Sequence, residues 1–274
     1  MTGSWHSRST RARSGVGQPT ERVQEVLASA YLPTEQVRLA INVLLVRTKT
    51  DLILVDTGCG AAFGDVGGRL VGNLAAAGVR PEQVTVVVLT HLHGDHFGGL
   101  ADPATNEPVF KNARFVLFRR EHDFWMNSPD LAASKLPPEV RAQFVQSAQA
   151  AVNALKGKWE LVAPQDRVLE GVEFLAAPGH TPGHLAIAFT SGSEQLINLA
   201  DVAHHSAISF AHPEWPLAFD TDPQQASETR RSFFDRAATD RARVFGVHLP
   251  FPGLGHIHSD GGRYAFVPEP WQPV

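Results

Sequence analysis

The chain has 274 residues, of which 43% are hydrophobic, and its formal net charge is −4. This length and apolar content allow a substantial buried core, in one large domain or two small ones. The acidic balance argues against a general nucleic-acid-binding protein, which would normally present a basic face. No apolar run reaches the length of a membrane span, and the single cysteine, Cys59, cannot form an intramolecular disulfide, which fits a reducing compartment.

The N-terminal region is rich in arginine and serine and lacks the apolar segment of a secretory signal. We therefore predict a disordered tail over residues 1–22, one domain over residues 23–274 and a cytoplasmic location. A short helix is expected over Glu21–Ala30, with Thr20 as its N-cap and Pro33 soon after its end.

Apolar segments bounded by turn residues predict the remaining strands and helices, whose alternation is typical of an α/β fold. Strands are expected over Val37–Val46 and Leu52–Val55, which form a hairpin, and over Val84–Leu89, Phe115–Phe118, Val172–Ala176, Gln195–Ala200, Arg243–Val247 and Tyr264–Val267. Helices are expected over Phe63–Ala77 with Gly78 as C-cap, over Glu139–Leu155 and over Thr221–Ala238, and a helical or lid-like region begins with Glu121–Met126.

The strand over Val84–Leu89 ends in the sequence THLHGDHFGG, which holds three histidines and an aspartate. Because the strand is short, rich in β-branched residues and apolar except for Thr85, we expect it to be buried on both faces. His91 and His93, two apart on an extended chain, can project to the same side, whereas Asp95 and His96 can turn towards a second point. These ligand-type residues predict a metal site, and one loop could serve two metals.

Three more predicted strands end at residues that can bind metals, namely His180, Asp201 and His248. The carboxylate of Asp201 has two oxygens and could bridge two cations. His256 competes with His248 as the last ligand, but it lies eight residues beyond the strand end, behind two prolines and two glycines. His184 falls inside the start of the next strand, so we expect it to be structural or to support a ligand.

The loop of residues 91–96 matches the His-x-His-x-Asp-His signature of the metallo-β-lactamase superfamily, which this chain resembles. The resemblance implies a single-domain αββα sandwich with two divalent metal ions between the loop edges of its sheets. Zinc is the expected metal, with manganese, cobalt or iron as alternatives. The implied ligands are His91, His93 and His180 for one ion, Asp95, His96 and His248 for the other, and Asp201 for both, with Asp56 holding the histidine loop by hydrogen bonds.

Further motifs resemble methyl parathion hydrolase and its lactonase and arylesterase relatives. They are VDTG at 55–58, Phe63-Gly64, AAGVRPEQV at 76–84, DFW at 123–125, FDTD at 219–222, HLPFPGLGH at 248–256 and the terminal GGRYAFVP. Three residues after Asp201 the chain has His204, as in methyl parathion hydrolase, where many acyl-homoserine lactonases have a tyrosine that assists the reaction. The chain departs from this group because no strand is predicted before Pro33.

The resemblance implies a hydrolase in which a metal-bridging hydroxide attacks a neutral, partly aromatic ester, lactone or phosphotriester. The expected catalytic residues are Asp95, Asp201 and His204, with Asp95 or His204 carrying the proton to the leaving group. Aromatic residues are expected to line the substrate pocket: Phe63, Phe97, Trp125 and Phe144, with Trp215, Phe219 and Phe251 further out.

Other activities fit the same ligands. An acyl-homoserine lactonase, a glyoxalase II-like thioesterase and a mononuclear iron dioxygenase are alternatives, as is a metal-binding module without catalysis. One iron per chain would favour oxidation, and two zinc-like ions would favour hydrolysis. The expected partner is a small-molecule substrate rather than nucleic acid or a membrane, and a homodimer is an open alternative to a monomer.

Overall fold

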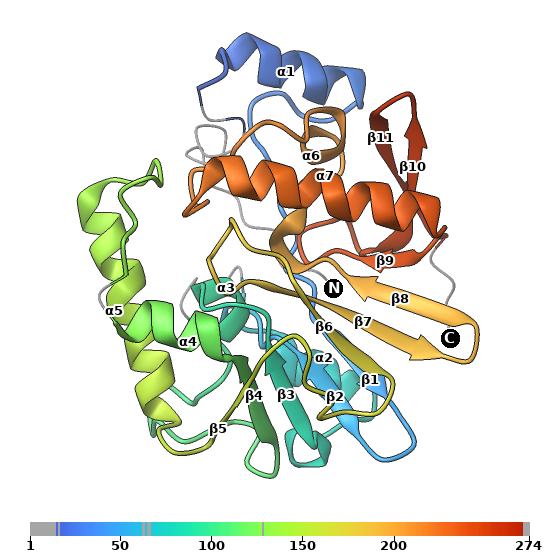
Figure 1. The fold of residues 1–274 in the computed structure, drawn as a ribbon. Coiled ribbons are helices and arrows are strands. Elements are labelled where there is room, and N and C mark those ends of the chain that lie inside the picture. The colour runs from blue at the N-terminus through green and yellow to red at the C-terminus, as the bar shows by residue number, and fades with distance from the viewer. Residues whose placement is uncertain (1–14, 16, 62–63, 65–66, 128, 271–274) are drawn as a thin grey trace.

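The computed structural model describes residues 15, 17–61, 64, 67–127 and 129–270. Two β-sheets pack face to face and helices cover both outer faces, so the chain forms an αββα sandwich (Figure 1). The single-domain α/β fold predicted from the sequence is therefore confirmed. None of the described helices is long and apolar enough to cross a membrane.

The first sheet has five strands in the order β1-β2-β3-β4-β5, and the second has six in the order β11-β10-β9-β8-β7-β6. The strands of the first sheet are β1 (Leu44–Arg47), β2 (Leu52–Val55), β3 (Val86–Leu89), β4 (Arg114–Phe118) and β5 (Trp159–Val162). Those of the second are β6 (Val172–Ala176), β7 (Leu185–Ser191), β8 (Glu194–Asn198), β9 (Arg243–Phe245), β10 (Leu254–Asp260) and β11 (Arg263–Pro268). Strands β2 to β5 pair in parallel, as do β8 and β9, so the segments that follow these strands emerge together.

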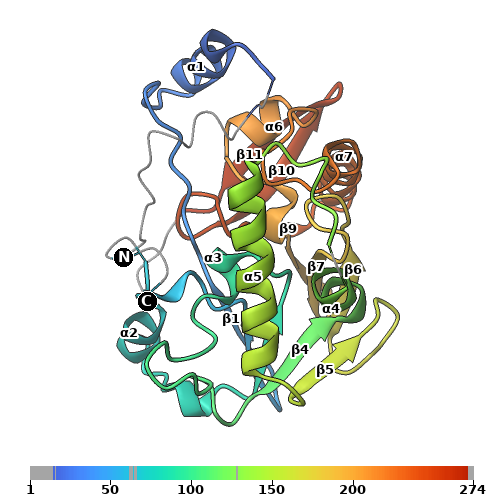
Figure 2. The ribbon, with the colours of Figure 1, turned by 90° about the vertical axis from the view of Figure 1, so that its left-hand side faces the viewer.

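Helices α2, α4 and α5 pack on the outer face of the first sheet, and α7 packs on the outer face of the second (Figures 1 and 2). Helix α1 lies beside α6 in a smaller apolar cluster. The helices are α1 (Thr20–Ser29), α2 (Leu70–Ala76), α3 (Gly94–Phe97), α4 (Arg119–Met126), α5 (Pro138–Ala154), α6 (Ile208–Ala211) and α7 (Pro223–Thr239), with the 3-10 turns η3 (Pro81–Gln83) and η4 (Ala200–Val202).

The alternation of side chains along the strands accounts for the sandwich. In β3, Val86 and Val88 point into the layer between the two sheets, whereas Val87 and Leu89 face the covering helices. All four side chains are buried, so the prediction of a strand buried on both faces is confirmed. Burying such a side chain contributes about 1.5–3 kcal/mol, so the apolar run that carries the histidine loop is anchored from both sides.

Two predicted elements begin later than expected. Strand β1 begins at Leu44 rather than Val37, because the backbone amides of Ala40 and Asn42 bond to residues 247–248 instead of to the first sheet. Helix α2 begins at Leu70 rather than Phe63, and the glycines before it include two with positive φ angles, which a continuous α-helix does not allow.

Two strands, β5 and β10, were not predicted. β10 has the sequence LGHIHSD, in which only Ile257 and Gly255 are buried, so its apolar signal is weak. At the N-terminus, α1 begins at Thr20 after an N-cap at Pro19, so Thr20 is not the cap. Residues 20–22 therefore belong to a helix rather than to a tail, and most of the remaining predicted tail, residues 1–14 and 16, lies outside the described residues.

Candidate metal centre

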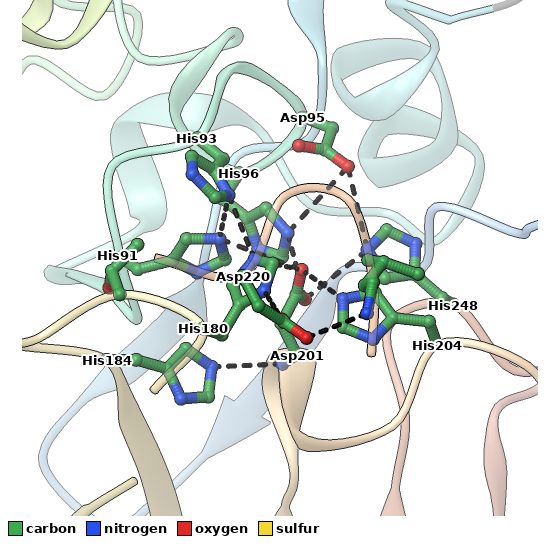
Figure 3. Close-up of polar contacts among 12 residues, drawn as sticks. His91, His93, Asp95, His96, His180, His184, Asp201, His204, Asp220 and His248 are labelled. Carbon is green, nitrogen blue, oxygen red and sulfur yellow. Dashed lines mark hydrogen bonds and ion pairs between the residues drawn. The ribbon is translucent and has the colours of Figure 1, made fainter. Parts of the chain in front are cut away.

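Loops at one edge of the sandwich bring a group of histidines and aspartates together (Figure 3). They are the segment after β3 with α3, the β6–β7 turn, η4 after β8, and the residues after β9. This group contains every residue that the sequence predicted as a metal ligand: His91, His93, Asp95, His96, His180, Asp201 and His248. The predicted strand ends therefore converge in space.

The first cluster consists of His91, His93, His180 and Asp201, all of which are buried. Nδ1 of His93 lies 3.1 Å from Nε2 of His91 and 2.9 Å from Nε2 of His180. Oδ2 of Asp201 lies 3.1 Å from Nε2 of His180 and 3.7 Å from Nε2 of His91. Three imidazole nitrogens and one carboxylate oxygen thus surround a single point.

The second cluster consists of Asp95, His96 and His248, on the other side of Asp201. Oδ1 of Asp201 lies 3.1 Å from Nε2 of His96 and 3.3 Å from Nε2 of His248. Oδ2 of Asp95 lies 3.5 Å from Nε2 of His248 and 3.9 Å from Nε2 of His96. Asp201 therefore directs one oxygen to each cluster, which is the arrangement of a carboxylate that bridges two cations.

The spacing of these atoms fits divalent metal ions. Bonds of about 2.0–2.1 Å in a tetrahedral zinc site separate neighbouring ligand atoms by about 3.4 Å, and the contacts above span 2.9–3.9 Å. In the described chain, Nε2 of His96 and Oδ1 of Asp201 are buried without a hydrogen-bond partner. Because unpaired buried polar atoms cost free energy, a cation between these two atoms would supply the partner that both lack.

Three of the histidines donate a hydrogen bond through the ring nitrogen that points away from the clusters. The pairs are Nδ1 of His96 with Oδ2 of Asp56 (2.8 Å), Nδ1 of His180 with Oδ1 of Asp220 (2.9 Å) and Nδ1 of His248 with the carbonyl oxygen of Ala40 (2.8 Å). Carboxylate and carbonyl oxygens can only accept, so each Nδ1 carries a proton and each Nε2 can present a lone pair to a metal.

Asp56 and His184 contact the ligands without joining either cluster. Asp56 also accepts hydrogen bonds from the backbone amide and the hydroxyl of Thr90, which precedes the first histidine. Nδ1 of His184 donates to the carbonyl of Ala177, and its Nε2 accepts from the backbone amide of Asp201 at 3.0 Å. Burial lowers the pKa of His184 to about 3, so this ring is neutral and holds the turn that carries Asp201.

Burial and neighbouring charges shift the pKa values of the first cluster in opposite directions. Burial, reinforced by the other histidines, lowers the pKa values of His91 and His93 well below 6.5. Burial also opposes protonation of His180, but the carboxylates of Asp201 and Asp220 outweigh it and raise the pKa to about 9. In the absence of metal, His180 is therefore the protonated member of this cluster at neutral pH.

His204 lies beside the bridging aspartate. Its Nε2 donates to Oδ2 of Asp201 at 3.0 Å, and its ring stacks on that of His248 with 5.4 Å between centroids. These three residues also form a group whose ligand atoms lie within 4.8 Å of one another. Burial lowers the pKa of His204 to about 4, so the ring is neutral at pH 7 and offers an N–H rather than a positive charge.

Two buried carboxylates beside the clusters were not predicted from the sequence. Asp220 holds His180, and its second oxygen accepts from the backbone amide of Leu217 at 2.8 Å. Glu121 accepts hydrogen bonds from groups next to the ligands of the first cluster. Asp220 falls in the FDTD motif, whereas Glu121 lies in the first turn of α4. Asp220 does not follow a predicted strand, and Glu121, three residues after the predicted strand Phe115–Phe118, was assigned to the start of a helical region instead of to the site.

A cavity of about 390 Å³ opens onto both clusters. Its wall combines ligand residues with the apolar side chains of Leu39, Ile41, Leu92, Phe97, Phe144, Leu217 and Phe219. The rings of Phe144 and Phe219 are stacked, with 5.8 Å between centroids and 21° between planes. Phe97 and Phe144 thus lie where the sequence analysis placed them, and Phe219, expected further out, lines the cavity with them.

Trp125 does not line this cavity, contrary to the prediction. Its side chain is fully buried in the core beneath α5, and its Nε1 donates to Glu121 at 2.7 Å. The ring meets His93 edge-on, with 5.8 Å between centroids, so Trp125 lies behind a ligand rather than in front of it. Trp215 is also buried away from the cavity, beside α1, and Phe63 lies outside the described residues.

The structure distinguishes the two candidates for the last metal ligand. His248 contributes Nε2 to the second cluster, whereas His256 lies on β10 with about half of its side chain exposed. Nε2 of His256 lies 3.8 Å from Glu269, which in turn pairs with Arg243 at 2.6 Å. His256 is therefore part of a surface charge group and not of the cluster.

An αββα sandwich with two clusters of histidine and aspartate at its loop edge, below a cavity, defines a metal-dependent hydrolase. The chain belongs to the metallo-beta-lactamase superfamily, whose family model matches residues 37–248. The clusters fit two divalent metal ions.

Individual proteins of this superfamily are also similar to this chain in sequence or in structure. A probable metallo-hydrolase of Mycobacterium tuberculosis is 28% identical over 233 residues, which cover 77% of this chain and 71% of that protein. An N-acyl homoserine lactonase of a Bacillus species is 25% identical over 214 residues, covering 71% and 76%. A solved structure is that of AidC, a dizinc quorum-quenching lactonase in complex with a product, N-hexanoyl-L-homoserine. It is similar to this chain with a TM-score of 0.94 and 34% identity, and the match covers 99% of this chain and 94% of AidC.

A second solved structure, the hydrolase AbOPH of the β-lactamase superfamily, is similar with a TM-score of 0.89 and 30% identity. The match covers 99% of this chain and 93% of AbOPH. Both structural matches therefore extend over nearly the whole chain.

Proposed function

We propose that this protein is a dizinc lactonase that opens the ring of an N-acyl homoserine lactone with an apolar acyl chain. The observation that carries the proposal is the position of Asp201, whose two oxygens join the two clusters on the wall of the cavity of about 390 Å³. No lysine or arginine lines that cavity within the described part of the chain, so beyond the metal centre its wall offers no cationic side chain for an anionic substrate. A neutral substrate with an apolar tail suits such a pocket.

Two divalent ions held here would polarise the carbonyl oxygen under attack and lower the pKa of a bound water. The chain's own residues would orient the substrate and move protons. The stacked rings of Phe144 and Phe219 would hold the acyl chain against the cavity wall. Asp95 and His204 both line the cavity, and we assign to this pair the transfer of a proton to the leaving oxygen.

The relatives support this choice among the hydrolytic reactions. AidC binds a product of N-acyl homoserine lactone opening and is 34% identical to this chain over nearly its whole length. The apolar wall of the cavity suits an acyl chain in the same way. We extend the lactone chemistry and the zinc content of AidC to this chain on that basis.

Phosphotriester hydrolysis is the second candidate, and one residue favours it. His204 takes the place of the tyrosine that many acyl-homoserine lactonases carry three residues after the bridging aspartate. A histidine at this position is shared with methyl parathion hydrolase. An aryl leaving group would need little protonation, so this reaction does not require the tyrosine.

A kinetic comparison on zinc-loaded protein tests the proposal. We would measure kcat/KM for N-hexanoyl-homoserine lactone, 4-nitrophenyl acetate and methyl paraoxon, together with the metal content of the protein before zinc loading. The lactone should have the highest kcat/KM of the three substrates. The Asp201→Ala variant should not hydrolyse the lactone. A preference for methyl paraoxon would select the second candidate, and one iron per chain without hydrolysis of any of the three would exclude both.

A further inference from the structure

A buried glutamate lies between the two loops that carry the first cluster. Glu121 is fully buried in the first turn of α4 and accepts four hydrogen bonds. Its Oε1 accepts from the backbone amide of Leu92 at 2.9 Å and from Nε1 of Trp125 at 2.7 Å. Its Oε2 accepts from the hydroxyl of Thr181 at 2.7 Å and from the backbone amide of Gly183 at 3.0 Å.

The four donors come from both sides of the first cluster. Leu92 lies between His91 and His93 in the loop that follows the first sheet's β3. Thr181 directly follows His180, in the turn between β6 and β7 of the second sheet. One carboxylate therefore bonds to a residue adjacent to each of the three histidines and holds the loop of one sheet against the loop of the other.

The chemistry of this site requires a carboxylate. In the described part of the chain Glu121 forms no ion pair, and all four of its partners are hydrogen-bond donors. Burying a charge without a cationic partner is costly, and only well-placed hydrogen bonds offset that cost. An amide of the same shape would turn an N–H₂ group towards two donors, so it could not satisfy them.

The turn after His180 packs closely against the backbone of Glu121. A Cβ atom added at Gly183 would lie 2.2 Å from the backbone nitrogen of Glu121, so the turn after His180 touches the first turn of α4 directly. Trp125, one helical turn further along α4, packs its ring against that of His93. A shift of the carboxylate is therefore transmitted to both loops.

The second cluster has other supports. His96 is held by Asp56, and His248 is held by the carbonyl of Ala40. None of the four hydrogen bonds that Glu121 accepts comes from a residue next to these two histidines in sequence. Glu121 thus contacts residues beside the first cluster only, whereas Asp56 holds His96 and also bonds to Thr90, which precedes His91.

We infer that Glu121 is a positioning residue that sets the metal affinity of the first cluster and leaves that of the second unchanged. The inference rests on the proposed two-metal centre. Residues that orient metal ligands typically contribute a factor of about 10–100 to metal affinity. Replacing Glu121 should therefore lower the metal affinity of the first cluster relative to that of the second, although the two sites share one bridging aspartate.

The inference is tested by titrating the metal-free, full-length protein with Co²⁺. Calorimetry and visible absorption record the binding. The variants His91→Ala and His248→Ala provide reference spectra, because each should retain one cluster. Glu121→Gln should bind one Co²⁺ with wild-type affinity and the spectrum of the His91→Ala protein, and a second Co²⁺ about 10–100-fold more weakly. Glu139→Gln is the matched control, since Glu139 lies in the first turn of α5 but is exposed to solvent.

Thr181→Val is a milder variant that removes one donor to Glu121 and keeps the volume of the side chain. It should weaken the same Co²⁺ site by a smaller factor, and it decides the question if Glu121→Gln does not fold. Wild-type binding of both ions, or an equal loss at both sites, would overturn the inference. If the His91→Ala and His248→Ala proteins each still bound two ions, the proposed two-metal centre would fail instead.

Discussion

Nδ1 of His96 donates a hydrogen bond to Oδ2 of Asp56 at 2.8 Å, and both side chains are buried. Because the carboxylate can only accept, this bond places the proton on Nδ1 and turns Nε2 towards Asp201. Asp56 has a φ angle of 61°, in the left-handed region where aspartate and asparagine are better tolerated than most side chains. The backbone thus places this carboxylate behind the second cluster.

Asp56→Asn should weaken metal binding at the second cluster by about 10–100-fold, and at the first cluster by a smaller factor, because Asp56 reaches His91 only through Thr90. Asparagine accepts the same backbone conformation, but its N–H₂ group must face either Thr90 or His96, which both donate to the aspartate. Metal analysis after dialysis against a weak chelator measures the effect. Asp123→Asn, at a side chain that is 53% exposed, is the control. Retention of both ions by Asp56→Asn would contradict the prediction.

Zinc binding should release protons. Asp201 and Asp220 overcome burial and raise the pKa of His180 to about 9 in the metal-free protein, so the ring is protonated at pH 7. A histidine must be neutral to bind a metal, so zinc displaces this proton and the affinity should rise as the pH approaches about 9. Calorimetric titrations in two buffers of different ionisation enthalpy would count the protons. Identical heats in both buffers would show that none is released.

His204→Phe should lower kcat for the lactone by about 10²-fold without changing the metal content. Phenylalanine keeps a ring against His248 but removes the N–H that Asp201 accepts at 3.0 Å. A substrate with a nitrophenolate leaving group needs little proton transfer, so its hydrolysis should fall less. An equal loss for both substrates would instead assign to His204 the role of holding Asp201.

Phe144→Ala should raise KM for a long-chain lactone more than it lowers kcat. The side chain stacks on Phe219 in the cavity wall, and its removal costs about 1–2 kcal/mol of binding, or about 5–30-fold in KM. Phe251→Ala is the control, because Phe251 is 57% exposed and does not line this cavity. The two variants should be compared across acyl chains of increasing length. An unchanged KM for every chain length would place the acyl group elsewhere.

Much of the fold followed from local patterns. Val172–Ala176 was predicted with the observed bounds, and β3 was recognised because a short β-branched run can be satisfied only in a sheet interior. β10 was not predicted because its exposed face carries His256 and His258, which lower the hydrophobicity of the segment. Trp125 was misplaced because a sequence motif does not indicate which side of a helix faces the core. The cytoplasmic location and the oligomeric state stay predictions.

The sequence by itself determined the ligand types and their positions at strand ends, since a buried strand followed by histidines is a local pattern. Only the tertiary structure decided how each ligand is held. Glu121 and Thr181 are 60 residues apart, His180 and Asp220 are 40 apart, and Ala40 and His248 are 208 apart. Hydrogen bonds between such distant residues depend on how the two sheets pack, and no local spacing encodes that.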